Sequence, residues 1–509
     1  MTRSVYILVH SLGYAGRSAA VLDQCRMFLS LGMKPIIATF KYEPRFDADL
    51  QSRSGDFALP EGATALNIYR DMRAPLTGDR HADWSRDEDA DSTGLTVSES
   101  PRGEATRLDY FDRLGRVVKH RVVSGGRTTS TVFYEGGRPV RQRDYEDTGA
   151  CGRERTLDPE TGKTTEERYF TPDGFCYVTR HLDPDSGRQL GVYCHDRDGK
   201  HTVRHAHNTP WHAEWLTTLF ESESTRPLAV AQHPTSMMKL MATDPGLSSR
   251  LFLSHVNLFQ DPFTLGAPLR PDYAQPFKRV QEMPVVVSLT EAQASDMRAT
   301  FGAKECDPVV IPNVIRDRRT TRAIKKKRKT VGIVCRLHPE QKRVDHLLRA
   351  WVDVVAAVPS AHLEIGGDGA ARKDLEKLTD ELGIKDSVTF LGWLDDSVDL
   401  MAACTLTVAT GRSEGFGLSI GESLAAGTPV VAYDVNYGPS DLIRHETDGY
   451  LVRDGDIKEL ATSIIDLLKH EHRAAKMGKN GAKRMAEVFS PQAIAPRWKS
   501  AFELADQRS

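Results

Sequence analysis

The sequence predicts an α/β protein in which two domains built on parallel sheets are joined to an inserted antiparallel β domain. Three observations predict this class. Buried strands alternate with helices over residues 1–75, and the same alternation resumes after residue 206. Between these two stretches, short strand-like segments are separated by glycine turns. A chain of 509 residues has room for two or three domains with substantial cores.

The first stretch, residues 1–75, is predicted to contain a strand, a helix and a second strand. Val5–Val9 is an apolar run of strand length, and residues 19–29 repeat apolar side chains at helical spacing. Lys34–Phe40 is again apolar and reads as the next strand. This alternation is typical of a parallel sheet covered by helices.

Residues 76–206 are predicted to form the inserted β domain. Residues 76–105 are polar, and from residue 107 onward turns such as Glu135-Gly-Gly-Arg138 recur at short intervals. Segments such as Thr165–Phe170 and Cys176–Arg180 lie between these turns. Asp-Gly and Gly-Arg turns between short strands predict an antiparallel meander.

After the insertion the chain returns to the first domain, which we expect to include residues 207–315. Residues 316–489 are predicted to form the second parallel-sheet domain. A last helix over residues 490–509 is expected, by analogy, to pack back on the first domain. The elements predicted for residues 207–315 are a helix at Trp211–Phe220, strands at Pro227–Ala231, Arg250–Ser254 and Pro284–Ser288, and a helix capped by Thr290.

The composition excludes several classes of protein. A formal net charge of −2 gives no bias toward nucleic acid. Seven cysteines are scattered without a Cys-x-x-Cys pair, which favours reduced thiols in a cytoplasmic protein. No apolar run reaches the roughly 18 residues of a membrane-spanning helix. Because Val5–Val9 is also too short for a signal peptide core, we expect a cytoplasmic protein.

The most informative motif lies near the C-terminus. Glu414 and Glu422 flank a glycine-rich turn that follows the apolar segment Leu406–Thr410 and opens a helix. Gly415 and Gly417 allow the backbone to approach a ligand closely, and the amides at a helix start suit a diphosphate. A carboxylate offers only acceptors and therefore suits the hydroxyls of a sugar or a ribose. The alternative is a surface loop with two incidental glutamates.

Four further motifs accompany the two glutamates, which are separated by seven residues. They are Val309–Asn313, Val331–Leu337, Tyr437–Ile443 and Asp448–Val452. Together these motifs resemble the retaining nucleotide-sugar glycosyltransferases of family 4, which have two facing Rossmann-like domains (the GT-B fold). The resemblance covers about residues 225–505 and a shorter N-terminal stretch. The β insertion resembles that of the poly(glycerol/ribitol-phosphate) teichoic acid α-glycosyltransferases and of glucosyltransferases that modify serine-rich adhesins.

The resemblance implies which residues carry the chemistry. Glu414 would hold and orient the transferred sugar. Arg336 and Lys342 would stabilise the departing diphosphate, because that step needs positive charge at the leaving oxygen. Relatives usually place this arginine and lysine five positions apart, whereas here they are six apart, so Arg343 is an alternative to Lys342.

His255 follows a predicted strand, and in relatives a histidine at such a strand end faces the transferred sugar. His10 and His233 are the alternatives for this role. No Asp-x-Asp cluster stands at an evident strand end, so we expect neither a metal ion nor another cofactor. The remaining donor contacts are assigned to Gly13, Gly16, Gly367, Gly392, Gly415, Phe416, Gly417, Leu418 and Glu422.

The resemblance implies a UDP-sugar-dependent retaining hexosyltransferase. We expect it to move glucose or N-acetylglucosamine from UDP-glucose or UDP-N-acetylglucosamine to a polyanionic cell-wall polymer, a poly(polyol-phosphate) wall teichoic acid, with formation of an α-glycosidic bond. A Ser/Thr hydroxyl of a protein is the second choice of acceptor, and a small molecule is the third. A non-catalytic partner subunit and a polymer-binding module built on the β domain are alternatives of other classes.

Two further expectations concern partners. The inserted sheet has edges that favour a homo-oligomer. The basic run 316–329 is either a solvated linker or an electrostatic attraction for the acceptor or for an anionic membrane, which would make the protein peripheral at the inner face of the cell membrane.

Overall fold

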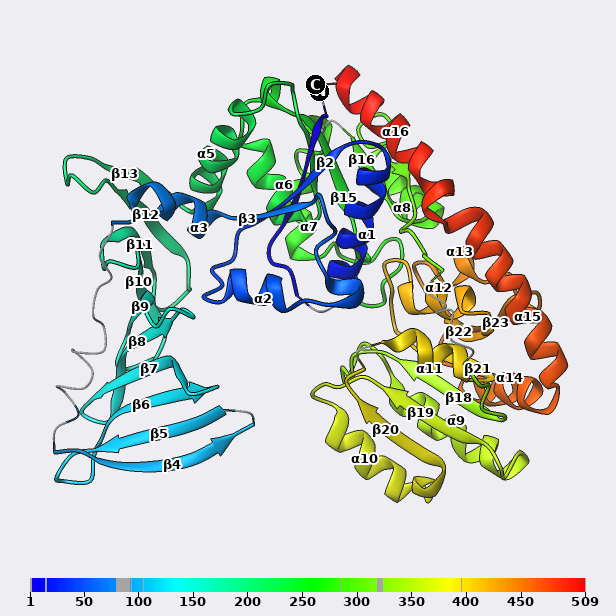
Figure 1. Cartoon of the computed structure of the whole chain (residues 1–509). Coiled ribbons are helices and arrows are strands. Elements are labelled where there is room, and N and C mark those ends of the chain that lie inside the picture. Colours follow the sequence, from blue (N-terminus) through cyan, green and yellow to red (C-terminus); the bar gives the residue numbers. More distant parts are fainter. Residues whose placement is uncertain are drawn as a thin grey trace.

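The computed structural model describes residues 2–13, 16–78, 92, 94–103, 105–283, 285–317, 324–394 and 396–508. In this part of the chain the strands form a seven-stranded sheet, a ten-stranded sheet and a six-stranded sheet. The first domain lies between the inserted sheet and the second domain (Figure 1). The predicted α/β class, with two parallel-sheet domains and an antiparallel insertion, is confirmed.

The sheet of the first domain is parallel throughout and has the order β17-β16-β15-β14-β1-β2-β3. Its central strand β1 pairs with β14, so the two chain segments on either side of the insertion form one sheet. The strands are β1 (Ser4–Val9), β2 (Lys34–Thr39), β3 (Thr64–Asn67), β14 (Leu228–Ala231), β15 (Ser249–Ser254), β16 (Val286–Ser288) and β17 (Val309–Val310). Residue 284, where we expected β16 to begin, lies outside the described residues.

Helices cover both faces of this sheet, because side chains of alternating strand residues point to opposite faces. One face carries the apolar cluster that includes Ile7 and packs on α1 and α16, and the other carries the cluster that includes Leu8 and packs on α5, α6 and α7. The helices are α1 (Gly16–Ser30), α2 (Phe46–Ser52), α3 (Ile68–Arg73), α5 (Asn208–Glu221), α6 (Pro234–Met241), α7 (Pro271–Phe277) and α8 (Glu291–Phe301). Thr290 caps α8 by accepting from the Gln293 N–H, as predicted.

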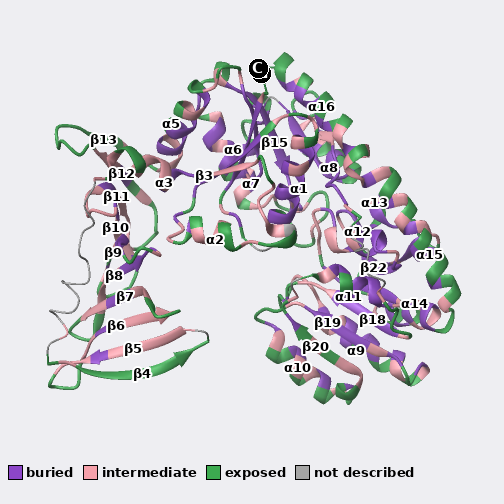
Figure 2. Ribbon diagram, viewed as in Figure 1, coloured by how far each residue is buried: buried purple, intermediate pink, exposed green. Residues whose placement is uncertain are grey.

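The inserted sheet is an antiparallel meander in which β4 to β13 follow one another in chain order. Much of it is half-buried or exposed, and every residue of the edge strand β4 is exposed (Figure 2). The strands are β4 (Thr96–Arg102), β5 (Ala105–Phe111), β6 (Val117–Ser124), β7 (Arg127–Glu135), β8 (Arg138–Tyr145), β9 (Cys151–Leu157), β10 (Thr164–Phe170), β11 (Cys176–Leu182), β12 (Gln189–His195) and β13 (Thr202–His205).

The insertion is attached to the first domain through α3. The buried carboxylate of Glu146 accepts hydrogen bonds from Arg70 at 3.1 Å and from Arg73 at 2.6 Å. The hydroxyl of Tyr177 donates to the carbonyl of Tyr69 at 2.9 Å. A paired and buried carboxylate together with packed tyrosines makes this junction a firm one.

The second domain has a parallel sheet of order β20-β19-β18-β21-β22-β23. Its strands are β18 (Thr330–Val334), β19 (His362–Gly366), β20 (Val388–Gly392), β21 (Leu406–Ala409), β22 (Val430–Asp434) and β23 (Gly449–Arg453). Its helices are α9 (Val344–Ala357), α10 (Arg372–Glu381), α11 (Ser397–Ala403), α12 (Leu418–Ala425), α13 (Pro439–Leu442) and α14 (Ile457–Lys469).

The end of the chain returns from the second domain to the first. Helix α15 (Glu471–Arg484) continues through a π-turn at Met485–Phe489 into α16 (Pro491–Arg508). On α16, the ring of Trp498 meets that of Phe28 of α1 at 5.3 Å, and Asp506 pairs with Arg3 at 2.7 Å. Figure 1 shows the two chain ends lying close together at this point.

The basic run 316–329 lies only partly within the described residues, because residues 318–323 fall outside them. In the described part, Lys327 pairs with Glu364 at 2.7 Å and Arg328 pairs with Glu471 at 3.1 Å. These cations are therefore already paired with the second domain. Within the described residues, no helix combines the length and the apolar character that crossing a membrane requires.

Candidate active site

Glu414 lies in the loop between the end of β21 at Ala409 and the start of α12 at Leu418. Its amide donates to the carbonyl of Asn436 at 3.2 Å, and its carbonyl accepts from the amide of Tyr437 at 2.8 Å. The loop is thereby held against the segment that follows β22. Gly417 precedes α12 with a φ of +88° and has no side chain to cap the helix, so no side-chain cap occupies the amides of Leu418 and Ser419.

Lys342 forms an ion pair with Glu414. The two side chains are only 19% and 22% exposed. Burial alone lowers the pKa of Lys342, but the Glu414 carboxylate outweighs burial and raises this pKa above its ordinary value. The lysine is therefore cationic, as its predicted role beside a leaving group requires.

Arg343, the alternative to Lys342, is turned away from Glu414. Its guanidinium donates to the carbonyls of Thr410 and Gly411 at 3.0 and 2.9 Å and pairs with Asp454. The structure therefore places Lys342, and not Arg343, beside Glu414, and Arg343 holds the loop after β21.

Arg336 follows β18 and is exposed. Its Nη2 donates to the side chain of Gln341 at 3.1 Å, and the carbonyl of Gln341 accepts from the amide of Arg412 at 2.8 Å. The loop of Arg336 and Lys342 and the loop of Glu414 are thus fastened together. The sequence pattern did not indicate Gln341 as the link.

His255 follows β15 and lies at the junction of the two domains. Its Nε2 is bonded to Oε1 of Gln232, whose own Nε2 donates to Gln24 at 2.8 Å. This chain of donors and acceptors places the imidazole proton on Nε2 and leaves Nδ1 as an acceptor. Burial, with smaller contributions from Arg17 and His233, lowers the pKa of His255 to about 3, so the ring is neutral near pH 7.

Gly415 brings the loop of Glu414 into contact with His255. A Cβ at Gly415 would lie 1.8 Å from the carbonyl oxygen of His255. The two residues come from different domains, so the glycine permits the closest approach of the domains at this point. We predicted that this glycine makes room for a ligand, which stays a prediction; the structure shows that it makes room for the opposite backbone.

The two alternative histidines lie on the same edge of the first sheet. Nδ1 of His233 accepts from the amide of Thr235 at 3.2 Å and caps α6, and burial, with Arg17 next, lowers the pKa of His233 to about 4. His10 follows β1, and its pKa is lowered first by burial and then by nearby cations. Among the three, His255 is the one against which the Glu414 loop packs.

The predicted donor contacts in the first domain meet the start of α12. A Cβ at Gly16 would lie 3.5 Å from the side chain of Leu418, and the amide of Gly13 donates to Ser18 at 3.0 Å. Residues 14 and 15 of this turn lie outside the described residues. The turn after β1 is therefore placed next to the helix start that the diphosphate is predicted to use.

The remaining residues that are predicted to contact the nucleotide sugar differ in which of their atoms could do so. The ring of Phe416 is 2% exposed and packs on Phe489, so only its backbone can meet a donor. Gly367 has a φ of +123°, and a Cβ there would lie 1.9 Å from the carbonyl of Cys335. Gly392, with a φ of +71°, ends β20, and Glu422 lies half-buried in α12. These roles in donor binding stay predictions.

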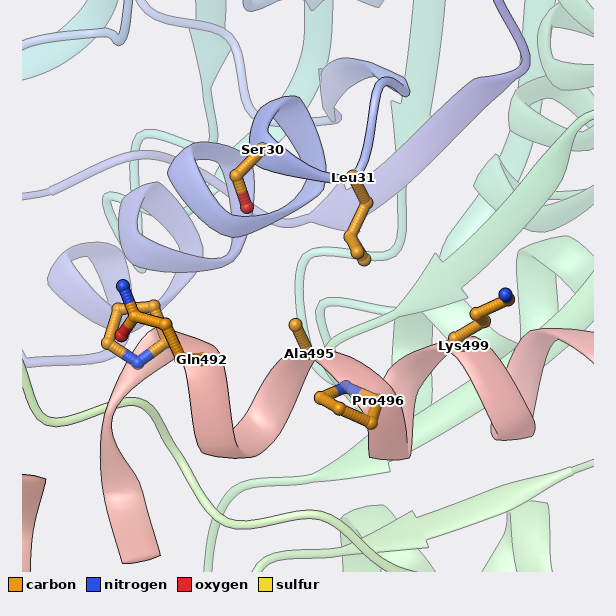
Figure 3. Close-up of a pocket in the computed structure, with 7 residues that line it drawn as sticks. Ser30, Leu31, Gln492, Ala495, Pro496 and Lys499 are labelled. Atoms are coloured by element: carbon orange, nitrogen blue, oxygen red, sulfur yellow. The ribbon is translucent and has the colours of Figure 1, made fainter. Parts of the chain in front are cut away.

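Neither of two other features of the described residues belongs to this site. A cavity of about 520 Å³ lies where α16 crosses the end of α1 near Ser30 (Figure 3). The site lies at the other end of α1, whose first residue, Gly16, meets Leu418 at the start of α12. Asp196, Asp198 and His201 bring ligand atoms within 4.8 Å of one another in the exposed turn after β12. Exposed acidic turns of this kind are common without a metal ion.

The two facing parallel-sheet domains, with the glutamate loop between them, define the GT-B fold of glycosyltransferases. A crystal structure of an S. aureus TarM mutant in complex with fondaparinux, alpha-GlcNAc-glycerol and UDP superposes with a TM-score of 0.85 at 20% identity, covering 98% of this chain and 100% of that one. The family model for Glycosyl transferases group 1 matches residues 314–484. The second domain is therefore a group 1 glycosyltransferase domain.

Two curated relatives are similar in sequence. The poly(ribitol-phosphate) alpha-N-acetylglucosaminyltransferase of Staphylococcus aureus (strain COL) is 26% identical over 280 residues, which are 55% of this chain and 56% of that protein. The poly(glycerol-phosphate) alpha-glucosyltransferase of Bacillus subtilis (strain 168) is 30% identical over 229 residues, which are 44% of this chain and 33% of that protein. The chain thus spans between a third and just over half of the length of these relatives.

Proposed function

We propose that this protein is a UDP-sugar-dependent retaining hexosyltransferase. It moves glucose or N-acetylglucosamine to a hydroxyl of a poly(polyol-phosphate) wall teichoic acid and forms an α-glycosidic bond. The observation that carries this proposal is the Lys342–Glu414 pair, which lies in the loop before the uncapped start of α12, where the neighbouring Gly415 meets the backbone of His255 across the domain junction. The group 1 glycosyltransferase domain and the fold support the same class of reaction.

The chemistry proposed for the site follows from its charges. Lys342, Arg336 and the amides that open α12 receive the diphosphate as it departs, which lowers the barrier where negative charge develops. Glu414 orients the sugar by accepting hydrogen bonds from its hydroxyls. The acceptor hydroxyl attacks from the face that the diphosphate leaves, and the diphosphate takes its proton. In this proposal the protein cations do the work that a metal ion does in other transferases, so no cofactor is needed.

The acceptor is proposed from the two curated relatives, both of which have a polyol-phosphate polymer in their names. This favours the polymer over the Ser/Thr hydroxyl of a protein. The edge strand β4, which is exposed along its whole length, supports self-association of the inserted sheet. A cytoplasmic location, peripheral at the membrane, is part of the same proposal.

The test is the release of UDP from UDP-glucose and UDP-N-acetylglucosamine, with and without purified teichoic acid. We expect the polymer to stimulate release from one donor. Glu414→Gln keeps the shape of the side chain but removes the charge, and it should lower the rate by roughly 100-fold or more. Glu381→Gln is the matched control, because Glu381 forms only an exposed ion pair with Lys377. A fully active Glu414→Gln protein would contradict the assignment of the site.

A further inference from the structure

Lys239 of α6 is a buried amine for which the described residues supply no anion, and burial, with Arg180 next, lowers its pKa to about 7. Its side chain is 6% exposed, and its Nζ lies 3.7 Å from the centre of the Phe40 ring. No hydrogen bond or ion pair joins this Nζ to any residue that the structure describes. A buried charge that lacks a partner is costly, and proteins retain one mainly for a function.

Other polar groups around Lys239 also lack partners. Neither ring nitrogen of the buried His212 is hydrogen-bonded, and the same holds for Oγ of Ser236, one turn before Lys239 on α6. Burial, then Lys239, Arg180 and His10, holds the pKa of His212 well below its ordinary value. The groups at this point are donors and cations, and no carboxylate contributes to the shifts of Lys239 or His212. Such a set suits an anion.

The position of Lys239 connects it to the reacting centre. Phe40 follows β2, and its amide donates to the carbonyl of His10. Because Nζ of Lys239 lies over the Phe40 ring, Lys239 reaches the edge of the sheet at His10. Besides burial, His10 lowers the pKa of His233, and His233 lowers the pKa of His255. Arg17 lowers the pKa of all three histidines. A basic row thus extends along the sheet edge, from the junction with the inserted sheet to the Glu414 loop.

This basic row is short of negative charge. Within the described residues, Asp272 is the carboxylate that approaches it, at 3.7 Å from Nε2 of His233. Arg17 is exposed and has no hydrogen bond or ion pair with any described residue. The cationic groups of this row are therefore Arg17 and the protonated form of Lys239, which attract a polyanion and hold it best where they are desolvated.

We propose that Lys239, together with His10 and Ser236, binds a phosphate group of the acceptor and so selects a phosphate-bearing acceptor over a neutral polyol. This inference rests on the proposed function, because it assigns the charged part of the acceptor to the first domain. The phosphate offers acceptors to the ammonium and hydroxyl groups, and its charge offsets the burial of Lys239. The donor diphosphate is served separately by Arg336 and Lys342.

The test compares two acceptors on two variants. Lys239→Met keeps the length of the side chain and removes the charge, and Lys278→Met is the control at an exposed lysine just after α7. With a glycerol-phosphate polymer, Lys239→Met should lose roughly tenfold or more in kcat/KM, mainly through a higher KM. Transfer to glycerol and slow hydrolysis of the donor should stay unchanged in both variants. Equal losses with the polymer and with glycerol would overturn the inference.

A second measurement separates binding from folding. Because Lys239→Met removes a buried charge without a partner, its Tm should equal or exceed that of the wild type, and a lower Tm would indicate a structural role instead. Inorganic phosphate should raise the Tm of the wild type but not that of Lys239→Met. This phosphate effect can be measured even if no UDP is released with any acceptor. An absence of UDP release would reject the proposed function alone. Equal protection of both proteins by phosphate would reject the subsite.

Discussion

Gly415 fits its place in the structure because glycine has no Cβ. The carbonyl oxygen of His255 occupies the place of its Cβ, so Gly415→Ala must push the Glu414 loop away from the first domain. A displacement of about 1 Å at a reacting centre can cost roughly 100-fold in rate, and we expect a loss of that order in UDP release. Gly246→Ala is the control, because the nearest atom there is a side-chain oxygen of Asp244 at 3.2 Å. Normal activity of Gly415→Ala would show that the domains need not approach here.

At the same scale, the sequence indicated the residues of the site but not their contacts. Glu414, Arg336 and Lys342 could be found because short local motifs contain them. The Lys342–Glu414 pair and the contact of Gly415 with His255 join segments that are far apart in the chain, so only the assembled sheets reveal them. Gln232, which fixes the proton of His255, carries no local signal beyond its place at a strand end.

At the scale of elements, α6 depends on a neutral histidine. His233 caps this helix with Nδ1, and its pKa is about 4, below the ordinary value of 6.5. Between pH 6.5 and pH 4 the unfolded chain binds a proton at this ring that the folded chain does not bind. The free energy of unfolding should therefore fall as the pH decreases over this range, by about 2 kcal/mol from this group.

His233→Asn tests this prediction. Asparagine also caps a helix through its side chain, so the substitution keeps α6 while it removes the titration. Denaturant unfolding at pH 7 and pH 4 should show a smaller loss of stability in the variant than in the wild type. An identical loss in both proteins would mean that His233 does not contribute to the acid sensitivity.

Most elements could be predicted because each has a local cause. Strands β1, β2 and β15 each contain an apolar run at their centre, and the inserted strands are separated by turns with glycine at positive φ, such as Gly162 and Gly187. Strand β17 could not be predicted in the same way, because it has only two residues and exists through its pairing with β16. Residue patterns do not encode such tertiary pairing.

At the scale of the whole molecule, Trp498 joins the end of the chain to the first domain. It is 2% exposed and packs on Phe28 of α1. Trp498→Ala should lower the free energy of unfolding by about 3–5 kcal/mol, because a large buried ring leaves a cavity. Trp393→Ala is the control, since Trp393 is 59% exposed, and it should cost less than about 0.5 kcal/mol. Chemical denaturation measures both, and equal effects would contradict the packing role of Trp498.

The arrangement of the domains could be predicted only in part. The change from helical periodicity to short strands with glycine turns indicates the insertion, and the alternation on both sides indicates parallel sheets. The order of the strands in each sheet depends on which strands pair with one another in space, and the sequence pattern does not specify this pairing. The row of histidines at the sheet edge likewise emerges only when β1, β14 and β15 lie side by side.

The pairing of β1 with β14 has a consequence for the order in which the protein folds during synthesis. Strands β1, β2 and β3 leave the ribosome first, but their central partner follows only after the whole meander has been translated. The meander consists of neighbouring strands and can fold from local contacts while the first three strands wait. During that interval the nascent chain exposes an unpaired apolar edge at Val5 and Ile7, which makes this stage the one that depends on chaperones.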